Sequence, residues 1–261
     1  MRLRADGRPL RVGHKGAAAL EPENTLRSIR RAVELGCDLV EFDVLDLHDG
    51  TLVLAHSDDL FEVSHGAARG QVRRLRLEQL REVAPELPTL DEALDLLSAH
   101  GRVGVHVDLK WHGYEDAAAA AIRRHGVVDR SVVSTVHAHS LRRLASIEPR
   151  LARGYTYPFD RRGVSGRRLL MPVAAAALAG LRRTLPLRIA GMLERARASA
   201  AMLYHGVVSR AAVERAHDYG AAVFAWTVDD EPTLERVIAA GVDAVVTNDP
   251  RIFGSDYTQK R

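Results

Sequence analysis

One unit recurs along the chain, and it constrains the fold more than any other feature of the sequence. In each copy an alanine- and arginine-rich helical stretch reaches a glycine, and a short run of β-branched residues follows; the copies lie at residues 32–44, 97–109, 122–136, 215–228 and 236–249. Glycine suits the position after a helix because it accepts the left-handed conformation. Runs that are apolar at nearly every position are typical of parallel strands covered by helices.

Eight runs of this kind are candidate strands, at residues 8–14, 38–44, 103–110, 131–136, 150–157, 199–204, 222–228 and 243–248. Strands that alternate with helices indicate a parallel sheet, and eight such units in about 250 residues match the size of a (β/α)8 TIM barrel. We therefore predict a single α/β barrel domain over residues 1–261. The alternative is an open doubly wound sheet, but no G-x-G-x-x-G motif follows the first run.

Residues 45–88 do not follow the repeat. Asp49 and Gly50 form a turn signal between two apolar runs, and a polar stretch follows before a helical pattern resumes in "PTLDEALDLL", residues 88–97. We predict that residues 45–88 form a small insertion at the end of the second strand.

Acidic residues interrupt two of the apolar runs near their ends. Glu41 and Asp43 lie two apart and so share one face of their strand, as do Asp108 and Lys110. Active sites of such barrels lie at the carboxyl ends of the strands. The three carboxylates should therefore converge there, where their mutual repulsion would be relieved by a divalent cation. Oxygen ligands favour Mg²⁺ or Ca²⁺ over zinc. The alternative is that the acids pair with Lys110 and nearby arginines at the barrel mouth.

Two of the twelve histidines stand out. His14 and His56 each end an apolar run, and the proposed fold brings both near the acids. Imidazoles beside a phosphate can give and take protons near neutral pH, so both are candidate acid–base groups.

Composition narrows the class of protein. The net charge is only +3, aromatic residues make up 5% of the chain, and the arginines occur as doublets in helical stretches, which argues against a nucleic-acid partner. A single cysteine, Cys37, excludes an intramolecular disulfide, and the amino-terminal stretch has no apolar signal region, so we expect a cytoplasmic protein. Residues 171–193 are apolar but interrupted by arginines and a proline. They predict a helix over the core rather than a membrane span, with weak contact to a membrane surface left open.

The chain resembles the glycerophosphodiester phosphodiesterase family. The resemblance lies in "HKG" at 14–16, "PENT" at 22–25, "EFDV" at 41–44 and "DG" at 49–50, and in His56, "VDLK" at 107–110, "WTVDD" at 226–230 and "GVDAVVTNDP" at 241–250. The ordered set covers nearly the whole chain. It implies a barrel with an insertion after strand two and metal-dependent hydrolysis of glycerophosphodiesters, which are small-molecule substrates, to glycerol 3-phosphate and an alcohol.

The resemblance also implies roles for individual residues. His14 and His56 match the acid–base histidines; Glu41, Asp43 and Asp108 match metal ligands, and Glu23 matches a glutamate by the metal site. Lys15 and Lys110 occupy phosphate-contacting positions, and Trp226 matches a tryptophan on the glycerol side of the pocket.

Four residues depart from the family pattern. Lys15 replaces arginine, Asp108 replaces glutamate, and Ser57 and Asn248 stand where aspartate is usual. These departures leave two alternatives to an ordinary glycerophosphodiesterase. One is a lipid phosphodiesterase of lysophospholipase D or sphingomyelinase D type, and the other is a barrel that binds phosphorylated ligands without turnover.

Overall fold

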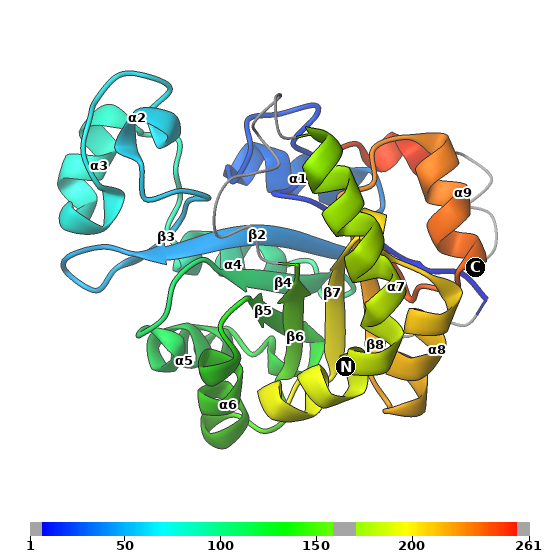
Figure 1. The fold of residues 1–261 in the computed structure, drawn as a ribbon. Helices are drawn as coiled ribbons and strands as arrows, with labels where there is room; N and C mark the ends of the chain where they lie inside the picture. Colours follow the sequence, from blue (N-terminus) through cyan, green and yellow to red (C-terminus); the bar gives the residue numbers. More distant parts are fainter. Residues whose placement is uncertain (1–6, 159–170, 255–261) are drawn as a thin grey trace.

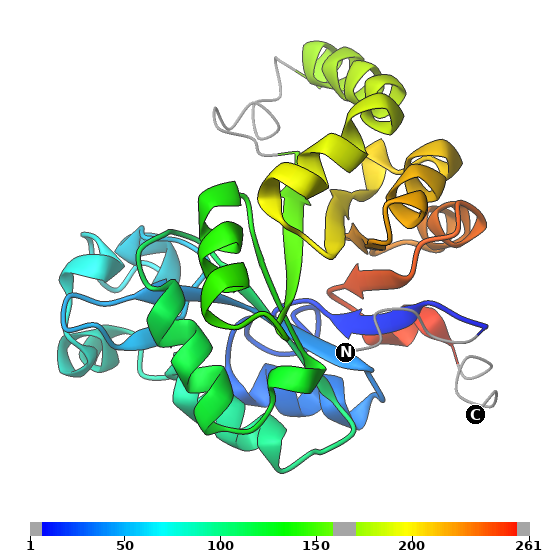
Figure 2. The ribbon, with the colours of Figure 1, turned by 90° about the horizontal axis from the view of Figure 1, so that it is seen from below.

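The computed structural model describes residues 7–158 and 171–254, with the side chains of 171–174 left out, and its core is a closed barrel of eight parallel strands (Figures 1 and 2). The sheet order is β1-β9-β8-β7-β6-β5-β4-β2, and pairing of β1 with β2, through Val12 opposite Leu39, closes the barrel. The strands are β1 (Leu10–Gly13), β2 (Leu39–Asp46), β4 (Gly104–Leu109), β5 (Ser131–Thr135), β6 (Ala152–Tyr157), β7 (Ala200–Tyr204), β8 (Ala222–Trp226) and β9 (Ala244–Thr247). The prediction of a TIM barrel is confirmed, and the open doubly wound alternative is wrong.

Helices surround the barrel on its outer face (Figure 2). They are α1 (Leu26–Glu34), α4 (Leu90–Ser98), α5 (Glu115–Arg124), α6 (Ala138–Ile147), α7 (Met171–Ala196), α8 (Arg210–Asp218) and α9 (Glu231–Ala239), with 3₁₀ turns at η2 (Val128–Arg130), η5 (His205–Val207) and η6 (Pro250–Phe253). A further 3₁₀ turn, η1 (Val72–Arg74), belongs to the excursion after β2. Gly36 and Gly220, which follow α1 and α8, have φ of 74° and 89°, the left-handed conformation expected of a helix-ending glycine. Gly101 ends its helical stretch without a positive φ.

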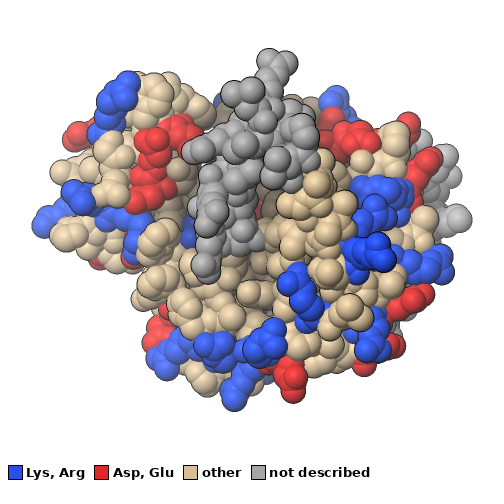
Figure 3. All heavy atoms as spheres, in the orientation of Figure 1, with Lys and Arg blue, Asp and Glu red and all other residues tan. Residues whose placement is uncertain are grey.

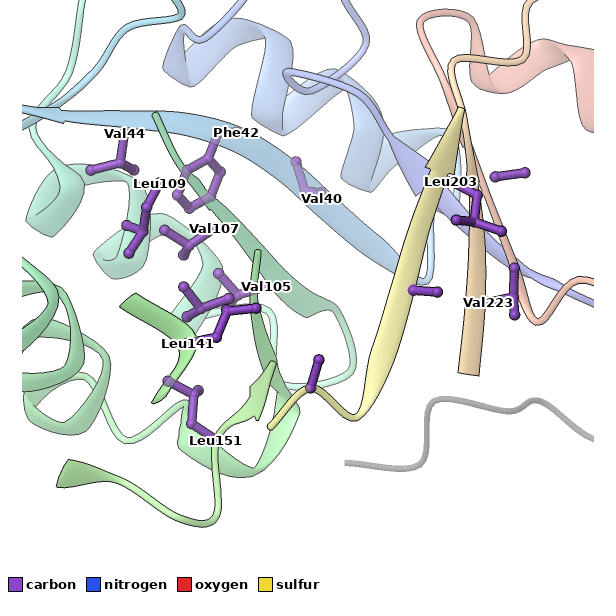
Figure 4. Packing of buried hydrophobic residues seen from close by; sticks show 14 of the residues in the cluster. Val40, Phe42, Val44, Val105, Val107, Leu109, Leu141, Leu151, Leu203 and Val223 are labelled. Atoms are coloured by element: carbon purple, nitrogen blue, oxygen red, sulfur yellow. The ribbon is translucent and has the colours of Figure 1, made fainter. Parts of the chain in front are cut away.

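Alternation along the strands separates two apolar layers. On β2, Val40, Phe42 and Val44 point outward and pack with residues of β4 and the helices, as Figure 4 shows. The barrel interior is filled by a separate cluster that includes Val12, Leu39, Met202 and Phe224. Because neighbours on a strand face opposite sides, the residues between the outward set, Glu41 and Asp43 among them, must face the interior.

An excursion leaves the barrel after β2. Strand β3 (Leu52–Leu54) pairs antiparallel with the extended end of β2, with Val44 opposite Leu54, so β2 runs two residues beyond its predicted end. Helices α2 (Leu60–Val63) and α3 (Leu77–Val83) follow and project to one side of the molecule (Figure 1). The excursion has its own apolar cluster of Leu45, Leu47, Val53, Ala55, Leu60, Val72, Leu80 and Ala84. This small core holds the loop that carries His56.

Helix α7 is the helix expected from the apolar stretch at residues 171–193. Its carboxyl half packs on the barrel through Leu185, Ile189 and Leu193, which are buried, while Leu187 faces solvent. Within residues 7–158 and 171–254, none of the helices combines the length and apolar character needed to cross a bilayer.

Lysine and arginine side chains are spread over the face shown in Figure 3, with acidic side chains among them. Several arginines of the outer helices pair with acids of a neighbouring helix, as Arg143 does with Asp116 and Arg124 with Asp91, both at 2.6 Å. The arginine doublets therefore supply partners for exposed ion pairs, each of which contributes about 0–1 kcal/mol to stability.

Candidate active site

Three carboxylates converge where β2 and β4 lie side by side. Asp43 is opposite Asp108 in the strand register, and one oxygen from each of Glu41, Asp43 and Asp108 lies within 4.8 Å of the other two. Glu41 and Asp43 are buried, and Asp108 is partly buried. Three oxygen donors at this spacing suit a hard divalent cation, which would hold them at about 2.0–2.6 Å. The donor set therefore fits the Mg²⁺ or Ca²⁺ that the sequence predicts.

Lys110 neutralises two of these acids in the structure. Its Nζ lies 2.8 Å from Asp43 Oδ1 and 2.9 Å from Asp108 Oδ2. Burial would lower the pKa of Lys110, but Asp108 and Asp43 raise it above its ordinary value. Burial likewise would raise the pKa of Asp43, yet the charge of Lys110, with smaller contributions from His56, Lys15 and His14, holds it below its usual range.

Glu41 differs, because within residues 7–158 and 171–254 no lysine or arginine side chain forms an ion pair with it, and its ion-pair contact is with His14 Nε2, at 3.9 Å. Burial, and after it the charges of Asp43 and Asp108, raise its pKa well above the ordinary value. The repulsion from Asp43 and Asp108 that helps to raise this pKa is the repulsion that a bound cation would relieve. The pKa of one carboxyl group is raised and that of its neighbour is lowered. Opposite shifts of this kind are typical of functional sites.

The turn after β1 brings a backbone amide to Glu41. The Lys15 amide donates to Glu41 Oε2 at 2.7 Å, and Lys15 itself has a φ of 50°. Gly16 follows with a φ of 87°, and a Cβ there would come within 2.4 Å of the Ser28 backbone. The tight turn at "HKG" therefore requires glycine at its third position, because a side chain there would collide with the Ser28 backbone.

The same turn places the Lys15 side chain beside Glu23. Lys15 Nζ donates to Glu23 Oε2 at 2.9 Å and lies 4.0 Å from Asp43 Oδ2. Glu23 is not part of the group of three carboxylates, and its side chain is 46% exposed. The structure thus brings Glu23 to the site through Lys15, at its edge.

Asn24 was not among the residues singled out from the sequence, although it lies within the "PENT" motif. Its Nδ2 donates to Asp43 Oδ2 at 2.9 Å, and its Oδ1 accepts from the Asp43 amide at 3.0 Å. Asn24 is buried and has a φ of 58°, a conformation that asparagine tolerates better than most residues. Asn24 therefore fixes the orientation of the Asp43 carboxylate.

We expect Asn24→Gly to weaken divalent-ion binding by about 10–100-fold, the usual cost of losing a group that orients a metal ligand. Glycine accepts the left-handed backbone, so the change removes the amide without adding strain. Calorimetric titration with Mg²⁺ and Ca²⁺ measures the effect, and thermal unfolding checks the fold. An unchanged affinity in a folded variant would show that Asp43 does not need this partner.

His14 directly follows β1, and a chain of hydrogen bonds determines which of its two ring nitrogens carries the proton. Asn248 Nδ2 donates to Asp229 Oδ2 at 2.6 Å, so its Oδ1 faces His14 Nδ1, 2.7 Å away. An amide oxygen accepts only, hence Nδ1 carries the proton and Nε2 keeps its lone pair in the neutral ring. Nε2 is the nitrogen on the side of the carboxylates, 3.9 Å from Glu41 Oε2. Burial lowers the pKa of His14, which Asp43 and Asn248 only partly offset.

Besides Lys15, two further departures from the family pattern have defined partners within this site. Asn248 orients His14, as described above, and a groove lined by Ala18, Ala19, Glu23, Asp229, Asn248 and Asp249 runs beside it. Asp108 Oδ1 accepts from the Ser134 hydroxyl, and Ser134 Oγ lies 2.8 Å from His106 Nε2. His106 is buried, and its pKa falls to about 4, chiefly through desolvation. Ser134 and His106 thus support the short Asp108 side chain from the barrel interior, a role that no sequence spacing signalled.

His56 enters from the excursion rather than from the barrel. Its ring is 44% exposed, and Nδ1 lies 3.5 Å from Glu62 Oε1 of helix α2. The amide of Ala55 donates to the Asp43 carbonyl at 3.1 Å, which attaches this segment to the acidic strand. Ser57, the next residue, accepts from the Asp59 amide in the turn that starts α2. His56 therefore lies at the rim of the site, on its solvent side.

Trp226 ends β8, and its ring packs edge-on against Tyr204 at a centroid distance of 5.6 Å. It packs against the apolar cluster of the barrel interior. Its Nε1 is buried without a hydrogen-bond partner among the described residues. Among the described residues, therefore, no hydrogen bond joins Trp226 to Glu41, Asp43 or Asp108.

The mouth of the barrel thus brings together three carboxylates, two lysines and a histidine whose Nε2 is not committed to Asn248, an arrangement that suits a hydrolase. The chain belongs to the glycerophosphoryl diester phosphodiesterase family, whose model matches residues 14–252. The family predicted from the sequence is confirmed, and the enzyme class is that of a phosphoric diester hydrolase.

Individual relatives agree with this assignment. A glycerophosphodiester phosphodiesterase of Caldanaerobacter subterraneus is 28% identical over 92% of this chain and 93% of the relative. An Oleispira antarctica phosphodiesterase, solved in complex with the product sn-glycerol-3-phosphate, shares the fold with a TM-score of 0.75 and 24% identity, over 96% of this chain and 97% of that one. A glycerophosphodiester phosphodiesterase of Thermotoga maritima has a TM-score of 0.74 and 20% identity, over 95% and 98% of the two chains.

Proposed function

We propose that this chain hydrolyses glycerophosphodiesters to glycerol 3-phosphate and an alcohol, with Mg²⁺ or Ca²⁺ held by Glu41, Asp43 and Asp108. The observation that carries the proposal is the group of three carboxylates within 4.8 Å of one another at the barrel mouth. A divalent ion bound there would compensate their charge and polarise a phosphate oxygen. Further support comes from the relatives named above, one of which holds sn-glycerol-3-phosphate.

The two histidines take the acid–base roles. His14 acts as the base through Nε2, since Nδ1 is committed to Asn248, and it accepts the proton of the attacking oxygen. His56 lies at the solvent side of the site and donates a proton to the departing alcohol. Each step is a proton transfer of the kind that imidazole performs near neutral pH.

Lys15 and Lys110 supply positive charge for the phosphate. Both amino groups already lie within 4.0 Å of Asp43, so charge developing on phosphate oxygens above the carboxylates falls within their reach. Glu23 holds Lys15 in place and remains a candidate ligand at the edge of the ion site. Trp226 offers an apolar wall for the glycerol carbons.

Glycerol 3-phosphate release from glycerophosphocholine tests the proposal. We expect release in the presence of Mg²⁺ or Ca²⁺, loss with excess chelator, and recovery when the ion is restored. A coupled glycerol-3-phosphate dehydrogenase assay measures the product, and the doubly substituted Glu41→Ala, Asp43→Ala protein is the inactive control.

Other outcomes of this assay would overturn the proposal in different ways. Hydrolysis of lysophosphatidylcholine but not of glycerophosphocholine would assign a lipid phosphodiesterase. Binding of glycerol 3-phosphate without turnover of either substrate would assign a phosphate-binding barrel. Turnover that resists chelation would contradict the role of the carboxylates.

A further inference from the structure

His56 lies on a short segment of the excursion, between Ala55 and the turn that begins α2. The Ala55 amide donates to the Asp43 carbonyl at 3.1 Å, which holds the amino-terminal side of this segment against the barrel. On the other side, His56 Nδ1 lies 3.5 Å from Glu62 Oε1 of α2, and the ring is 44% exposed. Packing alone therefore does not fix the ring, and its position depends on how the excursion is attached to the barrel.

The stretch of the excursion around the 3₁₀ turn η1 supports the carboxyl-terminal side of this segment. The Asp58 carbonyl accepts from the Val72 amide, and the Asp58 carboxylate accepts from the Arg73 amide, both at 2.9 Å. The Leu60 amide, at the start of α2, donates to the Gly70 carbonyl at 3.0 Å. The backbone next to Arg73 is therefore bonded both to the residues that follow His56 and to helix α2.

The side chain of Arg73 joins this stretch to the barrel. Its Nε donates to Asp46 Oδ1 at 2.6 Å, and its Nη2 donates to Asp46 Oδ2 at 2.9 Å. The guanidinium also lies over the ring of Trp111, with its central carbon 5.4 Å from the ring centroid. Two parallel hydrogen bonds to one carboxylate, together with the face of an aromatic ring, fix the plane of the guanidinium as well as its position.

Both partners of this guanidinium belong to the barrel. Asp46 is the last residue of β2, and Trp111 follows Lys110 directly after β4. The Trp111 amide donates to the Tyr114 hydroxyl at 3.0 Å, and that hydroxyl donates to the Val44 carbonyl of β2 at 2.6 Å. The excursion is thus attached, on the side of His56, to the two strands that carry the three carboxylates.

We propose that Arg73 is a positioning residue, which holds His56 where it can give a proton to the departing alcohol. The inference rests on the proposed function, in which His56 is the proton donor. Arg73 acts through the backbone that supports His56. Its loss should lower the turnover number and leave the Michaelis constant nearly unchanged, because the carboxylates and lysines that would bind the phosphate stay in place.

Two substrates with different leaving groups test whether Arg73 acts through the proton donor. Choline needs a proton to leave as an alcohol, whereas p-nitrophenolate leaves without one. In Arg73→Ala the turnover number for glycerophosphocholine should fall by about 10–100-fold, the cost of displacing a catalytic group by about 1 Å. Turnover of the p-nitrophenyl ester of glycerol 3-phosphate should hardly change. A substitution that only loosened the fold would lower both rates.

A second arginine that ties the excursion to the barrel provides a matched control. Arg81 Nη2 lies 2.7 Å from Glu92 Oε1, and this ion pair joins α3 to α4. Arg81→Ala therefore removes a tether of the same kind, but from α3 rather than from the stretch that supports His56. It should match the parent protein with both substrates.

A double substitution tests the path from Arg73 to the reaction. In a His56→Ala background, Arg73→Ala should cause no further loss with glycerophosphocholine, because no ring remains to be positioned. Arg73→Lys keeps the charge but loses the two parallel hydrogen bonds, so it should recover only part of the turnover lost in Arg73→Ala.

Hydrogen exchange measures the attachment independently of activity. The amides of residues 56–62 should exchange faster in Arg73→Ala than in the parent protein, and at the parental rate in Arg81→Ala. If the parent protein released no glycerol 3-phosphate, the proposed function would fail, and the exchange rates would still decide whether Arg73 holds this segment.

Three results would overturn the proposal. Equal losses with the two substrates in Arg73→Ala would make Arg73 a residue of general structural importance only. Full additivity of Arg73→Ala and His56→Ala would show that Arg73 does not act through His56. Unchanged exchange at residues 56–62 would show that Arg73 does not hold the segment. Circular dichroism checks the fold of each variant, and Arg73→Lys takes the place of Arg73→Ala in each comparison if the alanine variant does not fold.

Discussion

Replacing Glu41 with glutamine should lower divalent-dependent turnover by about a thousandfold or more, because the ion contributes several kcal/mol to transition-state stabilisation. The same change should stabilise the metal-free protein. The pKa of Glu41 is raised in the folded state, so ionisation of this group costs stability as pH rises above its ordinary value of 4.5. Glutamine does not ionise, and its oxygen can still accept from the Lys15 amide.

Asp43→Asn should abolish activity to a similar extent but with the opposite effect on stability. The pKa of Asp43 is lowered in the folded state, chiefly by Lys110 against the effect of burial. Its ionised form therefore stabilises the fold above its ordinary value of 3.8, and this contribution is lost as pH falls through the lowered pKa. Asparagine removes that contribution at neutral pH. Of the three acids, Asp108 then remains as the ion-pair partner of Lys110.

Calorimetric unfolding with chelator at about pH 5 and about pH 8 separates the two acids. Glu41→Gln should gain most over the parent protein at the higher pH, whereas Asp43→Asn should be less stable than the parent at both. Near-normal turnover of either variant at low Mg²⁺ or Ca²⁺ would contradict the ion site. Equal changes in the unfolding temperature of the two variants would contradict the opposite pKa shifts of Glu41 and Asp43.

The barrel could be predicted because its elements repeat. Each glycine-ended helix and the apolar run after it carry a local signal, and eight such units have one compact closed arrangement. The excursion was harder to delimit. Strand β2 continues to Asp46 because Leu45 and Leu47 belong to the apolar cluster of the excursion, and apolar residues of one run do not reveal which of two cores will bury them.

The acidic part of the site could be predicted because residues two apart on a strand share a face. Glu41 with Asp43, and Asp108 with Lys110, had to share a face, and a parallel register between β2 and β4 brought the two pairs together. The partners that orient these groups could not be predicted in the same way. Asn24 reaches Asp43 through a loop, and Asn248 reaches His14 from the other end of the chain. Loop conformation and long-range pairing leave no periodic signal.

The other histidines illustrate the same limit. His65 and His100 are exposed, whereas His125 and His217 are partly buried and lie beside Asp95 and Asp243. His112 lies 25 residues before His137, a separation with no meaning in the sequence. The pairing of β4 with β5 brings their following loops together, and the ring centres of His112, His137 and His139 lie 5.0–5.5 Å apart there.

His14→Ala should lower turnover by about a hundredfold or more, the usual cost of losing a general acid or base. The Asn248–Asp229 chain holds the proton on Nδ1 and leaves Nε2 as the acceptor. Desolvation lowers the pKa of His14 below its ordinary value of 6.5, so its neutral, basic form persists into mildly acidic solution. The acidic limb of the rate profile should therefore lie below 6.5.

Asn248→Ala is the matched test of how His14 is oriented. It removes the acceptor for Nδ1 but leaves the ring, so turnover should fall by about tenfold, less than in His14→Ala, with little change in the Michaelis constant. Nitrogen NMR of labelled histidine should show His14 protonated at Nδ1 in the parent protein and a mixture of tautomers in Asn248→Ala. Metal affinity should stay unchanged in both variants, because neither residue belongs to the three carboxylates. Normal turnover of His14→Ala would leave the ring a structural neighbour of Glu41 and would move the role of base to another group.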